Sequence, residues 1–213
     1  YRDFFRLQVG KEPYGYQLQV ADRLLAGQNV ILRAPTGAGK TWAVLAPFLF
    51  SRQEVLDGPS RLIYALPLRT LAQGVYRQAR EAAEKLGWPT ESTTTEIDGH
   101  RLETNPPYVT LQTGEQPDDP FFARGRIIVT TYDQVLSGLL DGPYGLSGRL
   151  HNINAAAVAG ALVVFDEFHL MEPHRAFLSA VAGLRLFHGL CQSVWMTATA
   201  TGPLEGELRS ALD

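Results

Sequence analysis

The segment RAPTGAGKTWA, residues 33–43, places two glycines, a lysine and a threonine between two apolar runs. Glycine allows tight backbone conformations that bring successive amides close to an anion, and a following helix points its amino end at the same place. A lysine there can reach phosphate oxygens, and a threonine hydroxyl can bind Mg²⁺. The residue types and their order therefore predict a phosphate-binding loop. The alternative is a glycine-rich turn that binds nothing.

A second segment with chemical potential is ALVVFDEFHLMEP, residues 161–173, in which an apolar run ends in two carboxylates. Asp166 could hold Mg²⁺ through a water, and Glu167 could orient and deprotonate an attacking water. Ligands of open α/β sheets collect at the carboxyl ends of the strands, so we expect this pair beside the glycine-rich loop. The alternative is an acidic cap that follows a strand.

The elements that must position these groups alternate between apolar, β-rich runs and helical patterns. Strands are predicted at 29–34, 61–67, 126–131, 161–167 and 192–198, with a weaker one at 108–113. Helices are predicted at 16–26, 39–55, 69–86, 132–140 and 174–188. This alternation predicts an α/β fold with a mostly parallel sheet sandwiched by helices.

Two segments rich in turn-forming residues, 88–107 and 114–125, are predicted as loops at the rim of the sheet. In the last predicted helix, apolar residues recur at helical spacing and are expected to face the core. They are Phe177, Leu178, Val181, Leu184 and Phe187.

Composition sets limits on function. With 213 residues, the chain can build one sizeable core but not two large domains. Its single cysteine, Cys191, excludes an internal disulfide framework and a multi-cysteine zinc site, and it fits a reducing, cytoplasmic environment. The net charge of −3 offers no general positive field for nucleic acid, which would have to be bound by a local stripe or by backbone amides. No apolar run approaches the ~20 residues of a membrane span, so no membrane partner is expected.

Taken together, the motifs resemble those of superfamily 2 helicases and translocases, and the resemblance implies a RecA-like P-loop domain that uses ATP and Mg²⁺. In that family the loop reads A-x-x-G-x-G-K-T. Its matches here would bind the nucleotide, and they are Ala34, Pro35, Thr36, Gly37, Ala38, Gly39, Lys40 and Thr41. DEFH resembles the D-E-x-H box, with Lys40, Asp166 and Glu167 as catalytic residues and Thr41 and Asp166 at the metal. Gln17, 23 residues before Lys40, stands where the family has an adenine-reading glutamine.

Shorter motifs resemble the family's contacts to the nucleic-acid backbone: LPLRTLA, LQTGE and VTTYDQVLSG. Their candidate contact residues are Pro67, Arg69, Thr70, Thr113, Gly114, Thr130, Thr131 and Asp133. Leu68 replaces the family's usual threonine. MTATAT resembles the S-A-T motif, which implies that Thr197 and Thr199, with His169, couple the acidic box to nucleic-acid binding. The alternatives are hydroxyl caps for Thr70, Thr113 and Thr131 and a surface helix start for Arg69.

Within superfamily 2, the closest resemblance is to Cas3, the helicase of type I CRISPR systems, through TTYDQVLSGLL and the following LHNINAAAVAGALVVFDEFHLMEP. It implies single-stranded DNA as a partner, together with a second RecA-like domain of the same protein and a guide-RNA surveillance complex. The function implied is antiviral DNA degradation. The alternatives are an RNA helicase of the same fold, a restriction-type DNA translocase and a catalytically silent ATP-binding scaffold.

The matches run from residue 17 to residue 199, and residues 1–213 are predicted to form one RecA-like domain, the N-terminal part of a larger motor. Without a second domain the chain would lack an arginine finger, which contributes roughly 10³–10⁵ in rate. We therefore expect this chain alone to bind ATP weakly and to hydrolyse it poorly. It contains no His-Asp dipeptide, so we expect no HD nuclease activity.

Overall fold

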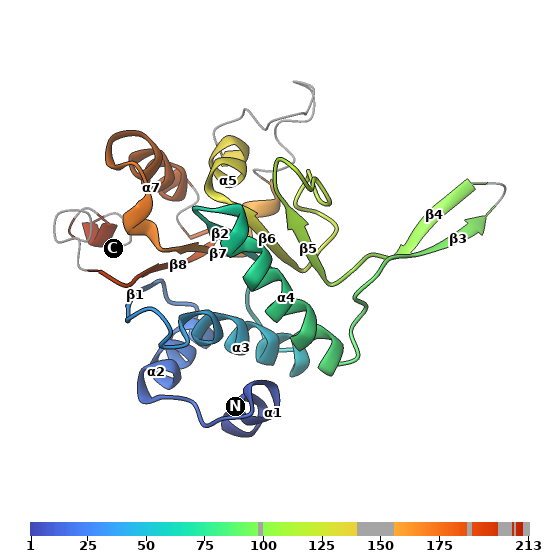
Figure 1. The fold of residues 1–213 in the computed structure, drawn as a ribbon, viewed down its shortest axis with the longest axis horizontal. Helices are drawn as coiled ribbons and strands as arrows, with labels where there is room; N and C mark the ends of the chain where they lie inside the picture. Colours follow the sequence, from blue (N-terminus) through green and yellow to red (C-terminus); the bar gives the residue numbers. More distant parts are fainter. Residues whose placement is uncertain (98–99, 140–155, 187–188, 200–205, 207, 211–213) are drawn as a thin grey trace.

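A six-stranded parallel sheet forms the centre of the computed structural model, which describes residues 1–97, 100–139, 156–186, 189–199, 206 and 208–210 (Figure 1). Its strand order is β1-β8-β7-β2-β6-β5, and every neighbouring pair runs parallel. The strands are β1 Val30–Arg33, β2 Arg61–Leu66, β5 Val109–Gln112, β6 Ile127–Thr131, β7 Ala161–Asp166 and β8 Gln192–Thr197. All six predicted strands, including the weaker one, are therefore confirmed.

Helices cover both faces of this sheet. The first face carries α2 Gly15–Leu25, α3 Lys40–Gln53 and α4 Arg69–Lys85, with α1 Arg2–Val9 packed on α3. The second face carries α5 Tyr132–Leu139 and α7 Leu178–Leu186, which follows a π-helical turn, Pro173–Phe177. Successive strand residues alternate between the two cores, so that Tyr64 of β2 lies in the first and Ile63 in the second. No helix in the described ranges is long and apolar enough to cross a membrane.

The predicted helices are present, although residue 140 and residues 187–188 lie outside the described part of the chain. The eight-residue α1 was not predicted. Of the apolar stripe, Phe177 and Val181 are buried, but Leu178 is 46% exposed, so its assignment to the core was wrong. Adjacent helical residues are rotated by about 100°, which carries Leu178 away from the face that Phe177 buries. The side chain of Leu184 and all of Phe187 lie outside what the structure describes.

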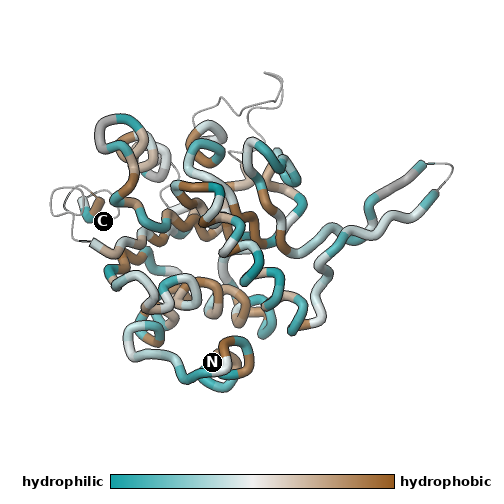
Figure 2. The backbone as a smooth tube through the Cα atoms, in the orientation of Figure 1, coloured by the Kyte–Doolittle hydropathy of each residue, from teal (hydrophilic) through white to brown (hydrophobic). Residues whose placement is uncertain are grey.

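A projecting hairpin corrects the prediction that residues 88–107 form a loop. Strands β3 Thr93–Ile97 and β4 His100–Asn105 pair antiparallel and extend away from the sheet (Figure 1). The hairpin is mostly polar, in contrast to the brown central strands (Figure 2). Residues 93–96 and 103–105 of the hairpin are exposed, so they lack the apolar pattern on which strand prediction depends. The β-branched residues of the hairpin are the feature that favours a strand. Segment 114–125 is irregular, as predicted.

A buried carboxylate organises the irregular segment between β5 and β6. Asp119 is fully buried, and its oxygens accept hydrogen bonds from three backbone amides and from the Thr110 hydroxyl. The amides belong to Ala123, Arg124 and Gly125, at 2.8–3.1 Å. Charge-assisted bonds of this kind are stronger than neutral ones and replace the secondary structure that the segment lacks.

We predict that Asp119→Ala will destabilise the chain by about 3 kcal/mol, because each buried donor left unpaired costs roughly 1–3 kcal/mol. Urea unfolding followed by circular dichroism would measure the change. The matched control is Asp118→Ala, which removes an exposed neighbouring carboxylate and should change stability by less than about 0.5 kcal/mol. Equal effects of the two substitutions would contradict a special role for Asp119.

Candidate nucleotide and nucleic-acid sites

The predicted phosphate loop connects the end of β1 to the start of α3. Gly37 and Gly39 have φ angles of 80° and 84°, the left-handed region that favours glycine. A Cβ at Gly37 would meet no atom of the described residues within 4 Å. The need for glycine at this position therefore comes from its backbone conformation. The amide of Ala34 donates to the Thr197 carbonyl at 3.1 Å, which ties the start of the loop to the end of β8.

Lys40, the first residue of α3, reaches across the phosphate loop from the start of the helix to Ala34. Its side chain is only 6% exposed, and Nζ donates to the Ala34 carbonyl at 3.2 Å and to Oε1 of Glu167 at 3.0 Å. A buried ammonium needs such partners, because an unpaired charge there would be strongly destabilising. The phosphate loop and the acidic motif thus meet at the carboxyl edge of the sheet, as the sequence predicted.

Asp166 is the last residue of β7, and both of its carboxylate oxygens accept hydrogen bonds. Oδ1 accepts from the Glu167 amide at 2.9 Å, and Oδ2 accepts from the Tyr64 hydroxyl at 2.7 Å. Burial raises the pKa of the Asp166 carboxyl, while the Tyr64 hydrogen bond and the charge of Lys40 act in the opposite direction. Tyr64 was not predicted from the sequence. The available signal was a hydroxyl within the apolar run RLIYAL. In the sheet Tyr64 pairs with Val164, which precedes Asp166 by two residues and therefore lies on the same face of β7.

Glu167 has a strained backbone, with φ at 56° although it is not glycine. Such conformations cost of order 1–3 kcal/mol and persist where the surroundings enforce them, often at functional sites. Its Oε2 is buried without a hydrogen-bond partner among the described residues, and His169 Nδ1 lies 3.5 Å from it. An unsatisfied carboxylate oxygen beside the phosphate loop is a suitable acceptor for a water molecule.

Thr197, at the end of β8, connects the acidic motif to MTATAT. Its hydroxyl lies 2.9 Å from His169 Nδ1 and is hydrogen-bonded to the main chain of Thr199. Its carbonyl also receives the Ala34 amide from the phosphate loop. The three predicted coupling residues are therefore in one hydrogen-bonded group that touches both halves of the candidate nucleotide site.

Gln17 fastens α2 to the phosphate loop. The side chain is 3% exposed, its Nε2 donates to the Gly39 carbonyl at 2.9 Å, and its Oε1 accepts from the Tyr14 amide at 2.8 Å. Tyr16, missed by the sequence analysis, donates a second bond from its hydroxyl to the Ala38 carbonyl. Because an amide group has two N–H groups and two lone pairs, Gln17 keeps capacity for an adenine edge, and that role stays a prediction.

The residues present fit a nucleotide with a divalent metal ion. The space beside Gly37 is open, and Glu167 Oε2 has an unused lone pair. Lys40 can exchange its two present acceptors for phosphate oxygens. Thr41 and Asp166 offer oxygen donors, which are the ligands that Mg²⁺ prefers.

A separate groove of about 470 Å³ lies beside the start of α4. The carboxyl ends of β2 and β6 and the segment that follows β5 form its other walls. Six of the eight predicted nucleic-acid residues line it, together with Leu68 and Gln134: Pro67, Arg69, Thr70, Gly114, Thr131 and Asp133. The amino end of α4 opens at this groove, and such an end attracts phosphate. Arg69 also pairs with Glu115 across the groove's edge.

Thr113 and Thr130 do not line this groove, so their predicted contact to nucleic acid is not supported by the geometry. Thr130 is fully buried and donates to the Gln112 carbonyl at 2.7 Å. Thr113 is 3% exposed, and its hydroxyl accepts the Gln116 amide at 3.2 Å, as in the alternative reading of a hydroxyl cap. Sequence motifs cannot distinguish these inward-facing hydroxyls from outward-facing ones.

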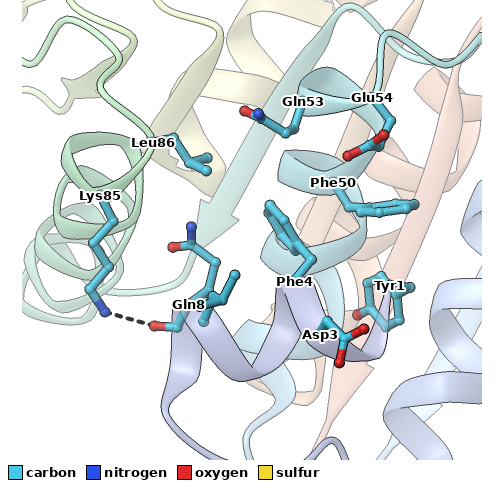
Figure 3. Close-up of a pocket in the computed structure, with 10 residues that line it drawn as sticks. Tyr1, Asp3, Phe4, Gln8, Phe50, Gln53, Glu54, Lys85 and Leu86 are labelled. Carbon is cyan, nitrogen blue, oxygen red and sulfur yellow. Dashed lines mark hydrogen bonds between the residues drawn. The ribbon is translucent and has the colours of Figure 1, made fainter.

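Another pocket, of about 660 Å³, lies between α1 and the carboxyl ends of α3 and α4 (Figure 3). Phe4 and Phe50 line it, and Lys85 donates to the Gln8 carbonyl at its edge. The 14 residues of α3 separate this pocket from Lys40 by about 20 Å, so it is not part of the nucleotide site.

A phosphate loop after β1 and an acidic pair at the end of the central β7 lie at one edge of a parallel sheet, and this arrangement defines a RecA-like nucleotide-binding domain. Residues 14–205 match the family model described as DEAD/DEAH box helicase. The match covers most of the chain, which therefore belongs to this family and is a helicase domain of superfamily 2.

Individual relatives share shorter stretches. The probable ATP-dependent RNA helicase ddx52 of Dictyostelium discoideum is 40% identical over 70 residues, 33% of this chain and 10% of that protein. Reverse gyrase of Pyrobaculum aerophilum is 32% identical over 87 residues, 41% of this chain and 7% of that protein. The alignments thus span a tenth or less of these relatives. The crystal structure of T. fusca Cas3-AMPPNP is similar in fold, with a TM-score of 0.70 and 18% identity over 98% of this chain and 24% of that one.

We predict that Gly39→Ala will be more damaging than Gly37→Ala, its matched control. Both substitutions force alanine into the left-handed region, at about 1–2 kcal/mol each. Only at Gly39 would the new Cβ lie 2.9 Å from Gln17 Nε2 and displace the bond that holds α2. Thermal unfolding should show the larger loss for Gly39→Ala, and hydrogen exchange should show faster exchange at residues 14–17 in that variant alone. Identical profiles for both variants would contradict this account.

Proposed function

We propose that the chain is the nucleotide-binding half of an ATP-dependent helicase or translocase. The observation that carries this proposal is the 3.0 Å ion pair between Lys40 of the phosphate loop and Glu167 of the acidic motif. It brings a phosphate-binding cation and a candidate general base to one point. Family membership and the groove beside α4 support nucleic acid as the polymer that the protein would bind and move along.

In the proposed reaction, Lys40 leaves Glu167 to bind β- and γ-phosphate oxygens. Glu167, released from this partner, would orient a water molecule and accept its proton as the water oxygen bonds to the γ-phosphorus. The bond between the γ-phosphorus and the β-phosphate oxygen would break in this step, with ADP as the leaving group. Thr41 and Asp166 would hold Mg²⁺, which when bound neutralises charge on the phosphate oxygens. Thr197 and His169 would couple the acidic motif to the phosphate loop, because their bond joins His169 to the end of β8 and the Thr197 carbonyl accepts the Ala34 amide. The resemblance of MTATAT to the S-A-T motif extends this proposed coupling to nucleic acid.

A second RecA-like domain of the same protein would complete the site with arginine side chains. We therefore expect this chain alone to bind ATP weakly and to hydrolyse it slowly, and we expect no HD nuclease activity from it. The two domains would close over a single strand, with the groove at Arg69 holding phosphates rather than bases.

For the particular protein, we propose Cas3 of a type I CRISPR system, acting with a guide-RNA surveillance complex in antiviral DNA degradation. Support comes from the TTYDQVLSGLL motif and from the fold similarity to T. fusca Cas3-AMPPNP. Part of the supporting sequence, residues 140–155, lies outside the described structure. An RNA helicase is the second candidate, since ddx52 is among the relatives. Competition between DNA and RNA of one sequence would separate the two.

We predict that Glu167→Gln in the full-length protein will lower ATP hydrolysis by at least about 100-fold, because general-base catalysis contributes 10²–10⁴. ATP binding should persist in this variant and be lost in Lys40→Ala. A phosphate-release assay and equilibrium binding would measure both. The control, Glu81→Gln on the exposed side of α4, should match the wild type. Equal hydrolysis by wild type and Glu167→Gln would favour a silent scaffold.

We predict that Arg69→Ala will weaken binding of single-stranded DNA about equally for all sequences. Loss of one phosphate contact should reduce the slope of log affinity against log salt by about one. Fluorescence anisotropy over a salt series would measure the slope. Arg77→Ala, an exposed arginine on the same helix but outside the groove, is the control and should leave the slope unchanged. An unchanged slope in Arg69→Ala would contradict the assignment of this groove.

A further inference from the structure

Tyr64 is a buried polar residue that the proposed reaction does not use. It lies within β2 and is fully buried in the first core. Leu62 and Leu66, two positions away on the same face of the strand, lie in that core as well. Its hydroxyl donates to Oδ2 of Asp166 on the adjacent β7 at 2.7 Å. Burial and the charge of Asp166 raise the pKa of this phenol, while the Thr41 side chain at the start of α3 acts in the opposite direction. The hydroxyl therefore contacts the carboxylate of one of the two residues proposed to hold the metal ion.

We propose that Tyr64 is a positioning residue for the metal ion, and that its hydroxyl fixes the Asp166 carboxylate in the orientation that accepts hydrated Mg²⁺. This inference rests on the proposed function. The carboxylate is held at both oxygens, since the Glu167 amide occupies one lone pair of Oδ1 and Tyr64 one lone pair of Oδ2. Each oxygen keeps a second lone pair, which is enough for water molecules bound to the metal.

The alternative is that Asp166 merely satisfies a buried phenol. A tyrosine used only for packing would usually direct its hydroxyl to solvent or to a main-chain carbonyl. Tyr132 shows that second arrangement at the same aspartate, because its hydroxyl donates to the Asp166 main-chain carbonyl from the opposite core. Tyr64 instead bonds the carboxylate of Asp166, which is the group proposed to hold the metal ion.

The two tyrosines provide a matched pair for the experiment. Tyr64→Phe and Tyr132→Phe each delete one oxygen atom that bonds Asp166, but only the first frees the carboxylate. Loss of a partner that orients a metal ligand typically lowers metal affinity by 10–100-fold. The expected effect of Tyr64→Phe is therefore on the dependence of nucleotide binding on Mg²⁺, rather than on binding of the nucleotide alone.

The test uses the full-length protein and a fluorescent ATP analogue, titrated with Mg²⁺ or measured in EDTA. In Tyr64→Phe, the Mg²⁺ concentration for half-maximal binding should rise by about tenfold or more, while the affinity in EDTA stays within about twofold of wild type. Tyr132→Phe should lower the thermal unfolding midpoint and leave the Mg²⁺ curve in place. Tyr64→Met, which fills similar space with a flexible apolar side chain, should reproduce the shift and serves if Tyr64→Phe does not fold.

Coinciding Mg²⁺ curves for wild type and Tyr64→Phe would overturn the inference and leave the proposed function standing. Equal shifts in Tyr64→Phe and Tyr132→Phe would also overturn it, because the cause would then be general displacement of Asp166. Absence of nucleotide binding by the wild type at any Mg²⁺ concentration would instead overturn the proposed function, and the inference with it.

Discussion

The buried ion pair between Lys40 and Glu167 is the interaction on which the rest of the site depends. It joins the first residue of α3 to the residue after β7, two points 127 positions apart in the chain. An ammonium at 6% exposure is stable only with such an acceptor, and the acceptor is available because Glu167 adopts a strained left-handed backbone. The pair therefore holds the phosphate loop and the acidic motif together and keeps ready the two groups that the proposed reaction would separate.

Around this pair, hydrogen bonds make the carboxyl edge of the sheet a single unit. Thr197 contacts the phosphate loop through its carbonyl and the acidic motif through its hydroxyl, and Gln17 fixes the same loop from α2. Aromatic side chains of the second core pack under the acidic motif. Phe168, within DEFH, packs edge-on against Trp195, which stacks on Phe165 with ring centroids 4.5 Å apart. The buried Phe168 thus fixes the backbone of this motif and, with it, the positions of its neighbours Glu167 and His169.

Much of the fold and most of the site could be predicted because they arise from local patterns. Buried parallel strands are continuous apolar runs, and the phosphate loop needs glycines and a lysine in one short segment. The hairpin at 93–105 was missed, since strands without a buried face have no apolar periodicity. The predicted nucleic-acid contacts of Thr113 and Thr130 are not supported by the geometry for a related reason. A hydroxyl that bonds the main chain and one that lines a groove cannot be distinguished in the sequence.

By itself, the sequence determined the strands and helices, their order along the chain and the parallel character of the sheet. It also determined the edge at which Lys40 and Asp166 lie, because the carboxyl ends of parallel strands share one side. Only the tertiary structure decided which groups meet there. It turned Tyr64 toward Asp166 from a strand 102 residues away and paired Thr197 with His169. Such contacts depend on strand register and on which core each side chain enters, and these are set by packing among distant segments rather than by any local pattern.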